Sequence, residues 1–405
     1  MDKKIKITID DVKKAQEKIK SVIRVTEMDK SFSLSKICGS EVFLKHENQQ
    51  FTGSFKLRGA YNKISRLSEA EKQKGVVACS AGNHAQGVAF SATKAGARAT
   101  IVMPVTAPLI KVEATRDYGA EVILHGDIYD ETYEKARELE RSQALHFVHP
   151  YEDPLVIAGQ GTIGLEILQK ISELDSVLVP IGGGGLISGI ATAVKALRPS
   201  CRVIGVQSSQ APGMQQLFQH KTPEALIKKI STIADGIAIK KPSQMMYDQY
   251  ISKLVDDVIT VTDDEIAEAM VLLLERAKSV TEGSGAVGVA ALLNRQVKIG
   301  KNCCVILSGG NIDLNMVSKI IEKGQIRKGR LVQLSVIVDD TPGTLSRLTK
   351  AIADLRANIL EVHHDRVSQG LFLRETRIDF VLETTHKEHI QQIKEALEKA
   401  GGRIQ

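Results

Sequence analysis

The sequence predicts an α/β protein whose long first region carries open parallel sheets and whose last part is a small ferredoxin-like domain. From residue 45 to about residue 320, short and fully apolar segments alternate with segments of helical periodicity. Strands that are apolar on both faces indicate parallel sheets with helices packed on both sides. After residue 330 the segments follow the order βαββαβ, which is typical of ferredoxin-like domains.

The predicted strands of the first region share a short apolar run that ends at a glycine, a proline or a polar loop. They cover residues 75–79, 99–103, 121–124, 176–181, 202–206 and 303–307. Helices are predicted at residues 84–95, 109–118 and 130–143, and also after the glycine run that follows residue 181. Ligands of parallel α/β sheets bind beyond the carboxyl ends of the strands. The glycine-rich and polar loops of this chain fall at those ends.

A short, basic segment at residues 324–330 is predicted to be a linker, with domains at residues 1–323 and 331–405. In the second domain, strands are predicted at residues 331–338, 359–367 and 371–383, helices at 340–355 and 387–400, and a short strand at the end. The turn between the two middle strands is expected at residues 368–370. This domain has about half the typical domain length, so we expect it to pair with another copy or to pack on the first domain.

The composition excludes several classes of protein. An apolar fraction of 43% and a charged fraction of 25% are those of a folded globular chain. The net charge is only +6, charges of both signs alternate, and tryptophan is absent, so we expect no nucleic-acid partner. Residues 177–194 have the length of a membrane span, but Pro180 and five glycines would break a spanning helix, so we expect no membrane association.

The cysteines and the first residues favour a cytoplasmic location. The five cysteines are odd in number and form no CxxC pair, which is typical of reduced, buried thiols. Residues 1–11 alternate charged and apolar residues and lack the apolar core of a secretory signal.

One lysine lies in a loop that suits covalent chemistry. The segment Thr52-Gly-Ser-Phe-Lys-Leu-Arg-Gly59 places Lys56 beside Phe55 at the expected start of a helix. Partial burial and a helix N-terminus both lower the pKa of an amine, and such an amine can form a Schiff base. The alternative is an ordinary solvated lysine, which this loop alone does not exclude.

Two other loops offer polar groups at strand ends. Cys79-Ser-Ala-Gly-Asn-His-Ala-Gln-Gly87 provides Ser80, the Asn83 amide and backbone N–H groups at a helix start, which suit a carboxylate ligand. The alternative for this loop is a turn in which Asn83 caps the helix. In Leu307-Ser-Gly-Gly-Asn-Ile-Asp313, Ser308 presents a neutral hydroxyl after an apolar strand, with an N-cap as the alternative.

The segment Pro180-Ile-Gly-Gly-Gly-Gly-Leu186 indicates an anion site. Its glycine N–H groups can converge on a phosphate, and four glycines are costly in chain entropy for a turn alone. A P-loop is excluded because no Gly-Lys-Ser/Thr follows. A dinucleotide site is disfavoured because the third glycine position is Ile187 and the next strand ends at Gln207 instead of an acid.

Together these loops resemble a known family. Gly53–Gly59, Ser80–His84, Gly182–Leu186 and Ser308–Asn311 occur in the order and spacing of the threonine dehydratase (threonine ammonia-lyase) family. That family has the tryptophan-synthase-β type of pyridoxal-phosphate fold, fold type II, which has two subdomains. The resemblance covers about residues 10 to 322. The segment Val338–Leu345 with Asn358-Ile359 looks like an ACT regulatory domain over a shorter stretch.

The resemblance implies a role for each loop residue. Lys56 would hold pyridoxal 5′-phosphate as a Schiff base and act as the base at the substrate's α carbon. Phe55 would pack beside the cofactor ring, Asn83 would hydrogen-bond its 3′ oxygen, and Ser80–His84 would hold the substrate carboxylate. The phosphate would lie on Gly182, Gly183, Gly184, Gly185 and Leu186. Lys56 and Ser80 are therefore the catalytic candidates.

Ser308 would face the pyridine nitrogen. A hydroxyl cannot keep that nitrogen protonated as a carboxylate would, and the weaker electron sink favours prompt β-elimination. The expected reaction converts L-threonine to 2-oxobutanoate and ammonia, and L-serine to pyruvate. This activity would belong to isoleucine biosynthesis or to threonine catabolism.

Three other functions are disfavoured by single features. Serine racemases of this fold carry a serine where this loop has Ala81, so the second proton donor is missing. A non-enzymatic amino-acid sensor would not need Lys56. A nicotinamide dehydrogenase is disfavoured because this chain lacks the third glycine and the ribose-binding acid of the dinucleotide motif. No metal site is predicted, because Gln207, Ala211 and Gly213 stand where those racemases have carboxylates. Glu282 is left as either a monovalent-ion ligand or a helix cap.

The ACT resemblance implies regulation and assembly. In such domains ligands bind where the first strand turns into the first helix, between paired copies. Pro342 and Gly343 would let that turn approach a ligand, and Asn358 would hold its amino group. The effector is expected to be an amino acid such as isoleucine or valine, or a nucleotide such as AMP. A homodimer or homotetramer is expected, and a dimerisation domain without a ligand is the alternative.

Overall fold

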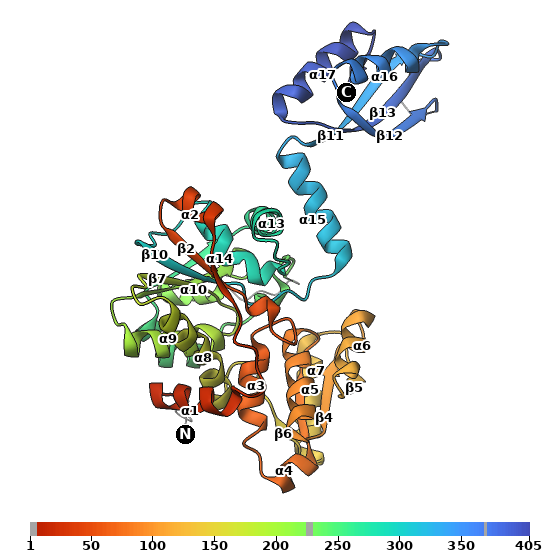
Figure 1. The fold of residues 1–405 in the computed structure, drawn as a ribbon. Helices are drawn as coiled ribbons and strands as arrows, with labels where there is room; N and C mark the ends of the chain where they lie inside the picture. Colours follow the sequence, from red (N-terminus) through yellow and green to blue (C-terminus); the bar gives the residue numbers. More distant parts are fainter. Residues whose placement is uncertain (1–5, 224–229, 368–370) are drawn as a thin grey trace. The chain divides into compact units, whose positions relative to one another are not determined.

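The computed structural model describes residues 6–223, 230–367 and 371–405. The chain divides into two compact units, Met1–Ile312 and Asp313–Gln405, which Figure 1 draws in colours that follow the sequence. The first unit contains two sheets with predominantly parallel strands, and the second contains one antiparallel sheet.

The larger sheet of the first unit has the order β1-β2-β10-β7-β8-β9. Its strands are β1 Met28–Lys30, β2 Glu41–Lys45, β7 Ser176–Pro180, β8 Arg202–Ser208, β9 Asp257–Val261 and β10 Asn302–Ile306. Only β1 pairs in the antiparallel direction. Val177 and Val179 pack with apolar residues of helices α8 and α9. Leu178 lies on the opposite face, against Gly288 of α14, so helices cover both faces.

The smaller sheet has the order β5-β4-β3-β6, and all its strands are parallel. Its strands are β3 Val76–Cys79, β4 Ala99–Met103, β5 Glu121–Leu124 and β6 His146–Phe147. Val76 and Ala78 pack against α3 and α5, and Val77 packs against α7 on the other face. The prediction of parallel sheets buried on both sides is confirmed.

The helices of the first unit are α1 Ile9–Ile19, α2 Phe32–Cys38, α3 Lys56–Ile64, α4 Glu69–Lys74, α5 Asn83–Ala95, α6 Leu109–Asp117, α7 Tyr129–Ser142, α8 Pro154–Lys170, α9 Gly185–Leu197, α10 Gly213–Phe218, α11 Gln244–Met246, α12 Ser252–Leu254, α13 Asp263–Leu272 and α14 Gly283–Leu293. Short 3-10 turns cover Glu47–Gln49 and Asp235–Ile237, and π turns cover Tyr247–Ile251 and Leu273–Ala277.

Helix α8 joins the two sheets of the first unit. Asp153 caps its start by accepting hydrogen bonds from the next N–H groups, and Pro154 occupies the first turn. The helix packs closely against α3, because a Cβ on Gly159 would lie 2.6 Å from the Cα of Gly59. This close packing holds the first turn of α3, which carries Lys56, firmly against the body of the unit.

The second unit confirms the ferredoxin-like order. It contains α15 Leu314–Arg327, β11 Leu331–Asp339, α16 Thr344–Asp354, β12 Asn358–Asp365, β13 Glu375–Glu383, α17 Lys387–Lys399 and β14 Arg403–Ile404. The sheet order is β12-β13-β11-β14, and α16 and α17 supply Leu348, Ile352, Ile393 and Leu397 to its core.

Three sequence expectations compare with these boundaries as follows. The linker expected at residues 324–330 begins inside α15, because this helix continues to Arg327. The domain limits predicted from the sequence, residues 1–323 and 331–405, stay predictions. The turn expected at residues 368–370 lies outside the described residues. No helix within the described ranges is long and apolar enough to cross a membrane.

Candidate active site

The structure brings the lysine loop, the Ser80–His84 loop and the Ser308–Asn311 loop together. The Phe55 N–H donates to the Ser308 carbonyl at 3.2 Å, and the Gly310 N–H donates to the Gly53 carbonyl at 2.9 Å. The Asn311 side chain then reaches Asn83 at 2.7 Å. All three loops follow strands or start helices at the carboxyl side of the sheets, where ligands of such folds bind.

Lys56 is the first residue of α3, as the sequence predicts, and Phe55 precedes it at the N-cap. The Lys56 amine donates to the Pro150 carbonyl at 3.3 Å and lies 5.1 Å from the centre of the Phe55 ring. Burial lowers the pKa of Lys56 to about 8, although the Glu282 carboxylate opposes this shift. The amine is therefore far easier to deprotonate than an ordinary lysine.

The four-glycine loop leads from β7 into α9. Gly184 has a φ of +96°, a conformation that favours glycine, and α9 begins at the next residue. Among the hydrogen bonds of the described residues, none uses an N–H of residues 182–186 as donor. The loop thus presents a row of N–H groups at a helix N-terminus, which is a ready anion site.

Tyr151 packs against this loop, and the residue before it, Pro150, contacts Lys56. A Cβ on Gly183 would lie 2.3 Å from the Tyr151 ring, and one on Gly185 would lie 2.8 Å from its Cβ, so both positions need glycine for this packing. Tyr151 follows Pro150, whose carbonyl accepts from Lys56. Sequence reasoning missed Tyr151, because its contacts are with residues about 30 positions later in the chain.

Ser80, Asn83 and Ser308 lie at the strand ends where they are expected. The Ser80 hydroxyl accepts from the Gly82 N–H at 3.2 Å, and Ser308 is buried with its hydroxyl 3.4 Å from the Ser284 carbonyl. Asn83 does not cap α5, since Gly82 occupies the N-cap and no side chain caps the helix. The capping alternative for this loop is therefore wrong.

Glu282 is a buried carboxyl group inside the site. It occupies the N-cap position of α14, where its backbone carbonyl accepts from the Gly285 N–H, but its side chain makes no capping hydrogen bond. Its carboxyl accepts from the Asn83 amide at 2.7 Å instead. Burial and the nearby Asp235 carboxylate raise the pKa of Glu282 to about 8. Its sequence context carried no signal for this role, because Asn83 lies 199 residues earlier.

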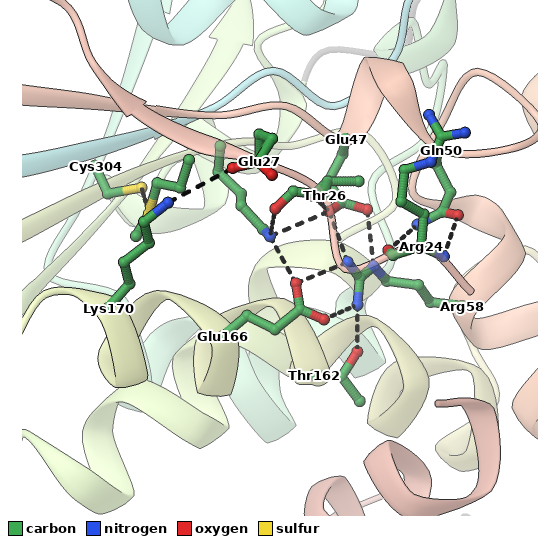
Figure 2. Close-up of polar contacts among 12 residues, drawn as sticks. Arg24, Thr26, Glu27, Glu47, Gln50, Arg58, Thr162, Glu166, Lys170 and Cys304 are labelled. Carbon is green, nitrogen blue, oxygen red and sulfur yellow. Dashed lines mark hydrogen bonds and ion pairs between the residues drawn. The ribbon is translucent and has the colours of Figure 1, made fainter. Parts of the chain in front are cut away.

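A buried network of charges centres on Arg58, two residues after Lys56 on α3 (Figure 2). Arg58 is fully buried and donates to Glu47 through Nε and Nη2, each at 2.8 Å. It also donates to Glu166 at 2.5 and 2.9 Å and to Thr162 at 3.1 Å.

Lys45 completes this network by donating to Glu166 at 2.6 Å and to the Thr26 carbonyl at 2.7 Å. The two basic and two acidic side chains balance, and every N–H of Arg58 has an acceptor. Burial alone would raise the pKa of Glu47, but Arg58 reverses this and holds it below its usual value. The network ties the start of α3 to α8 and to the segment around β2.

Comparison with known proteins identifies the family. The model for "Pyridoxal-phosphate dependent enzyme" matches residues 19–309, and the model for "ACT domain" matches residues 332–402. The chain belongs to the pyridoxal-phosphate-dependent enzymes.

Several proteins are similar to this pyridoxal-phosphate-dependent enzyme. An "L-threonine ammonia-lyase" of Thermotoga maritima is 48% identical, covering 96% of this chain and 97% of its own. A solved threonine deaminase from tomato, Solanum lycopersicum, has a TM-score of 0.72 at 35% identity, covering 78% of this chain and 89% of its own. Maize serine racemase has a TM-score of 0.73 at 35% identity, covering 79% of this chain and 98% of its own.

The residues present fit pyridoxal phosphate. The row of N–H groups at residues 182–186 suits its phosphate, and Lys56 is a deprotonatable amine of the kind that holds its aldehyde carbon. Several buried side-chain atoms of the site loops and of the first turns of α9 and α14 also have no partner within the described residues: Thr52 Oγ1, Ser54 Oγ, His84 Nδ1, Ser188 Oγ and Ser284 Oγ. A buried polar atom without a partner costs about 1–3 kcal/mol, so these atoms are suited to a polar ligand.

Proposed function

We propose that this pyridoxal-phosphate enzyme is an L-threonine ammonia-lyase, which converts L-threonine to 2-oxobutanoate and ammonia and L-serine to pyruvate and ammonia. One observation carries the proposal: the 48% identity to the Thermotoga maritima ammonia-lyase extends over 96% of this chain. The similarity therefore includes the catalytic loops and the ACT domain together.

Each group of residues in the proposed site has its own role in the reaction. When bound, pyridoxal phosphate draws electrons from the substrate's α carbon and makes its proton acidic. The N–H groups of residues 182–186 hold the phosphate, and Phe55 packs beside the ring. Ser80 and the N–H groups at the start of α5 hold the substrate carboxylate. The Lys56 amine, with its pKa of about 8, takes the α proton.

Ser308 and Ala81 favour elimination over racemisation. Ser308 offers only a neutral hydroxyl, which leaves the ring nitrogen a weak electron sink. Ala81 packs its methyl group against the core of the smaller sheet, and a methyl group cannot deliver a proton. The similarity to maize serine racemase therefore reflects the shared fold, and racemisation is the second candidate function.

The assay that tests this function measures four products from the purified holoprotein. With L-threonine we expect 2-oxobutanoate and ammonia in equal amounts, and with L-serine we expect pyruvate with little D-serine. Ala81 predicts this partition because no second acid is present. D-serine as the main product from L-serine would contradict the proposal and favour a racemase.

We also propose that the ACT domain binds an effector, an amino acid or a nucleotide, that controls the lyase, and that the protein forms a homodimer or homotetramer. The turn between β11 and α16 ends at Gly343, the N-cap residue, with a φ of +89°. The helix N–H groups beside it suit the carboxylate of an amino acid. Asn358 opens β12 and donates to Glu383 at 3.3 Å.

Gly343→Asp is expected to weaken the response to the effector while leaving basal turnover nearly intact. A negative charge at this turn would repel a carboxylate and reduce a coupling that is typically about 1–3 kcal/mol. Activity is titrated with isoleucine, valine and AMP. Gly401→Asp is the matched control, since Gly401 has a similar φ of +93° with no other atom within 4 Å of an added Cβ. An unchanged response in Gly343→Asp would place the regulatory site elsewhere.

A further inference from the structure

We propose that Asn311 and Glu282 are positioning residues that fix which way the Asn83 amide points in the site. This inference rests on the proposed function, in which Asn83 contacts the cofactor. It concerns a chain of side-chain hydrogen bonds that joins the lysine loop, the start of α5, the Ser308–Asn311 loop and the start of α14.

The direction of this chain is set at one end by a backbone carbonyl. The Asn311 Nδ2 lies 2.8 Å from the Thr52 carbonyl oxygen, which can only accept a hydrogen bond. The same Nδ2 lies 2.7 Å from the Asn83 side chain, so Asn83 must present its carbonyl oxygen there. The Gln86 Oε1 at 3.3 Å is a third acceptor around this amino group.

The hydrogen bond at the other end of this series agrees with the same orientation. With its oxygen facing Asn311, Asn83 turns its amino group to the Glu282 carboxyl, 2.7 Å away. The Glu282 carboxyl accepts this hydrogen bond, which agrees with the orientation of the Asn83 amide that the Thr52 carbonyl sets through Asn311. One N–H of the Asn83 amino group is used by Glu282, and the second is left to donate to a ligand.

Two glycines leave space for this series of hydrogen-bonded side chains. A Cβ on Gly53 would lie 2.2 Å from the Asn311 Oδ1, and one on Gly309 would lie 2.5 Å from the Glu282 Oε1 and 3.0 Å from the Asn83 Nδ2. Gly53 also has a φ of +69°, which favours glycine. These close approaches indicate that the loops are shaped around the three side chains.

The ionisable groups around Glu282 leave its carboxyl group free to interact with Asn83. Asp235, Lys111 and Lys56 are the ionisable groups that act on it, and Lys111 pairs with Asp235 at 3.4 Å. The Asn83 amide is its only described side-chain hydrogen-bond partner among the residues that the structure covers. Its role is therefore to orient Asn83, so that the cofactor oxygen meets a donor instead of a carbonyl oxygen.

Asn311→Asp tests the proposal in the holoprotein. The new carboxylate would face the Thr52 and Asn83 carbonyl oxygens, and Asn83 would turn over to relieve the clash. We expect cofactor affinity, measured by absorbance titration, to fall about tenfold or more, and the visible absorbance band of the bound cofactor to change. Asn294→Asp is the matched control, because it removes an amide-to-carbonyl hydrogen bond, to Ala290, outside the site.

A second substitution tests the direction of the chain. In the turned-over state the Asn83 oxygen faces residue 282, so Glu282→Gln can supply a donor there and is expected to restore part of the affinity lost in Asn311→Asp. Equal, independent losses from the two substitutions would overturn the proposal, as would wild-type affinity and absorbance in Asn311→Asp.

Asn311→Ala keeps the test decisive if the aspartate variant does not fold. It removes the donor without adding a charge, and we expect a smaller loss of cofactor affinity with the same change of absorbance. Parental affinity and absorbance in Asn311→Ala would also overturn the proposal. Because these readouts are cofactor binding and absorbance, a protein that binds the cofactor but does not deaminate threonine would contradict the proposed function alone.

Discussion

Lys56→Ala is expected to abolish the visible absorbance of the bound cofactor and to reduce turnover of L-threonine by at least about 10²- to 10⁴-fold. This range is the one for loss of a general base alone, and the loss of covalent cofactor attachment adds to it. The physical reason is that Lys56 combines a pKa of about 8 with a position at the helix start, beside Phe55 and Pro150.

Lys94→Ala is the matched control for this prediction. Lys94 also lies near a phenylalanine ring, 5.6 Å from the centre of Phe90, but it is exposed in the last turn of α5, at the opposite end of the helix from the Ser80–His84 loop. Its loss should leave the absorbance band and the turnover number near the parental values. Near-normal turnover in Lys56→Ala would refute the assignment of the base.

Arg58→Met is expected to lower the free energy of unfolding of the first unit by about 3–5 kcal/mol, the range for breaking a buried ion pair. Glu47 and Glu166 would keep their buried negative charges, and Lys45 alone remains to balance them. Urea unfolding followed by circular dichroism measures the change. Figure 2 shows the Glu47, Glu166 and Thr162 side chains converging on the Arg58 guanidinium group.

Arg98→Met provides the comparison for the Arg58 variant. Arg98 donates only to the carbonyls of Gln73 and Lys74 near the surface, so its replacement should cost about 0.5 kcal/mol or less. A similar urea midpoint for the two variants would contradict the view that the buried network holds the start of α3.

Local sequence signals predicted six strands of the first unit and the places of the candidate site loops, but they missed β1, β2, β6 and β9 among the described residues. The segments at residues 99–103 and 121–124 became β4 and β5 with the same limits, because short apolar runs between turn residues leave little choice. The position of Lys56 at a helix start was also predicted from neighbouring residues in the sequence. The Ser80, glycine and Ser308 loops followed from their places after apolar strands.

Features that depend on contacts between residues far apart in the sequence could not be predicted from local sequence patterns. Helix α8 is buried on nearly all sides and contains three glycines, so its segment lacks the one-sided periodicity of a surface helix. Glu282 acquires its role from Asn83, and Asn311 from Thr52, 259 residues away. The partners of Arg58 come from the 3-10 turn Glu47–Gln49 and from α8, and no pattern within α3 predicts them.

The central claim is that Lys56 holds pyridoxal phosphate at the meeting point of the four loops. Reduction of the holoprotein with borohydride fixes the cofactor to its lysine, and peptide mass spectrometry then locates it. We expect the added phosphopyridoxyl mass on the peptide that contains Lys56, with loss of the visible band. The same mass on a peptide without Lys56, or bleaching with no modified lysine, would contradict the account.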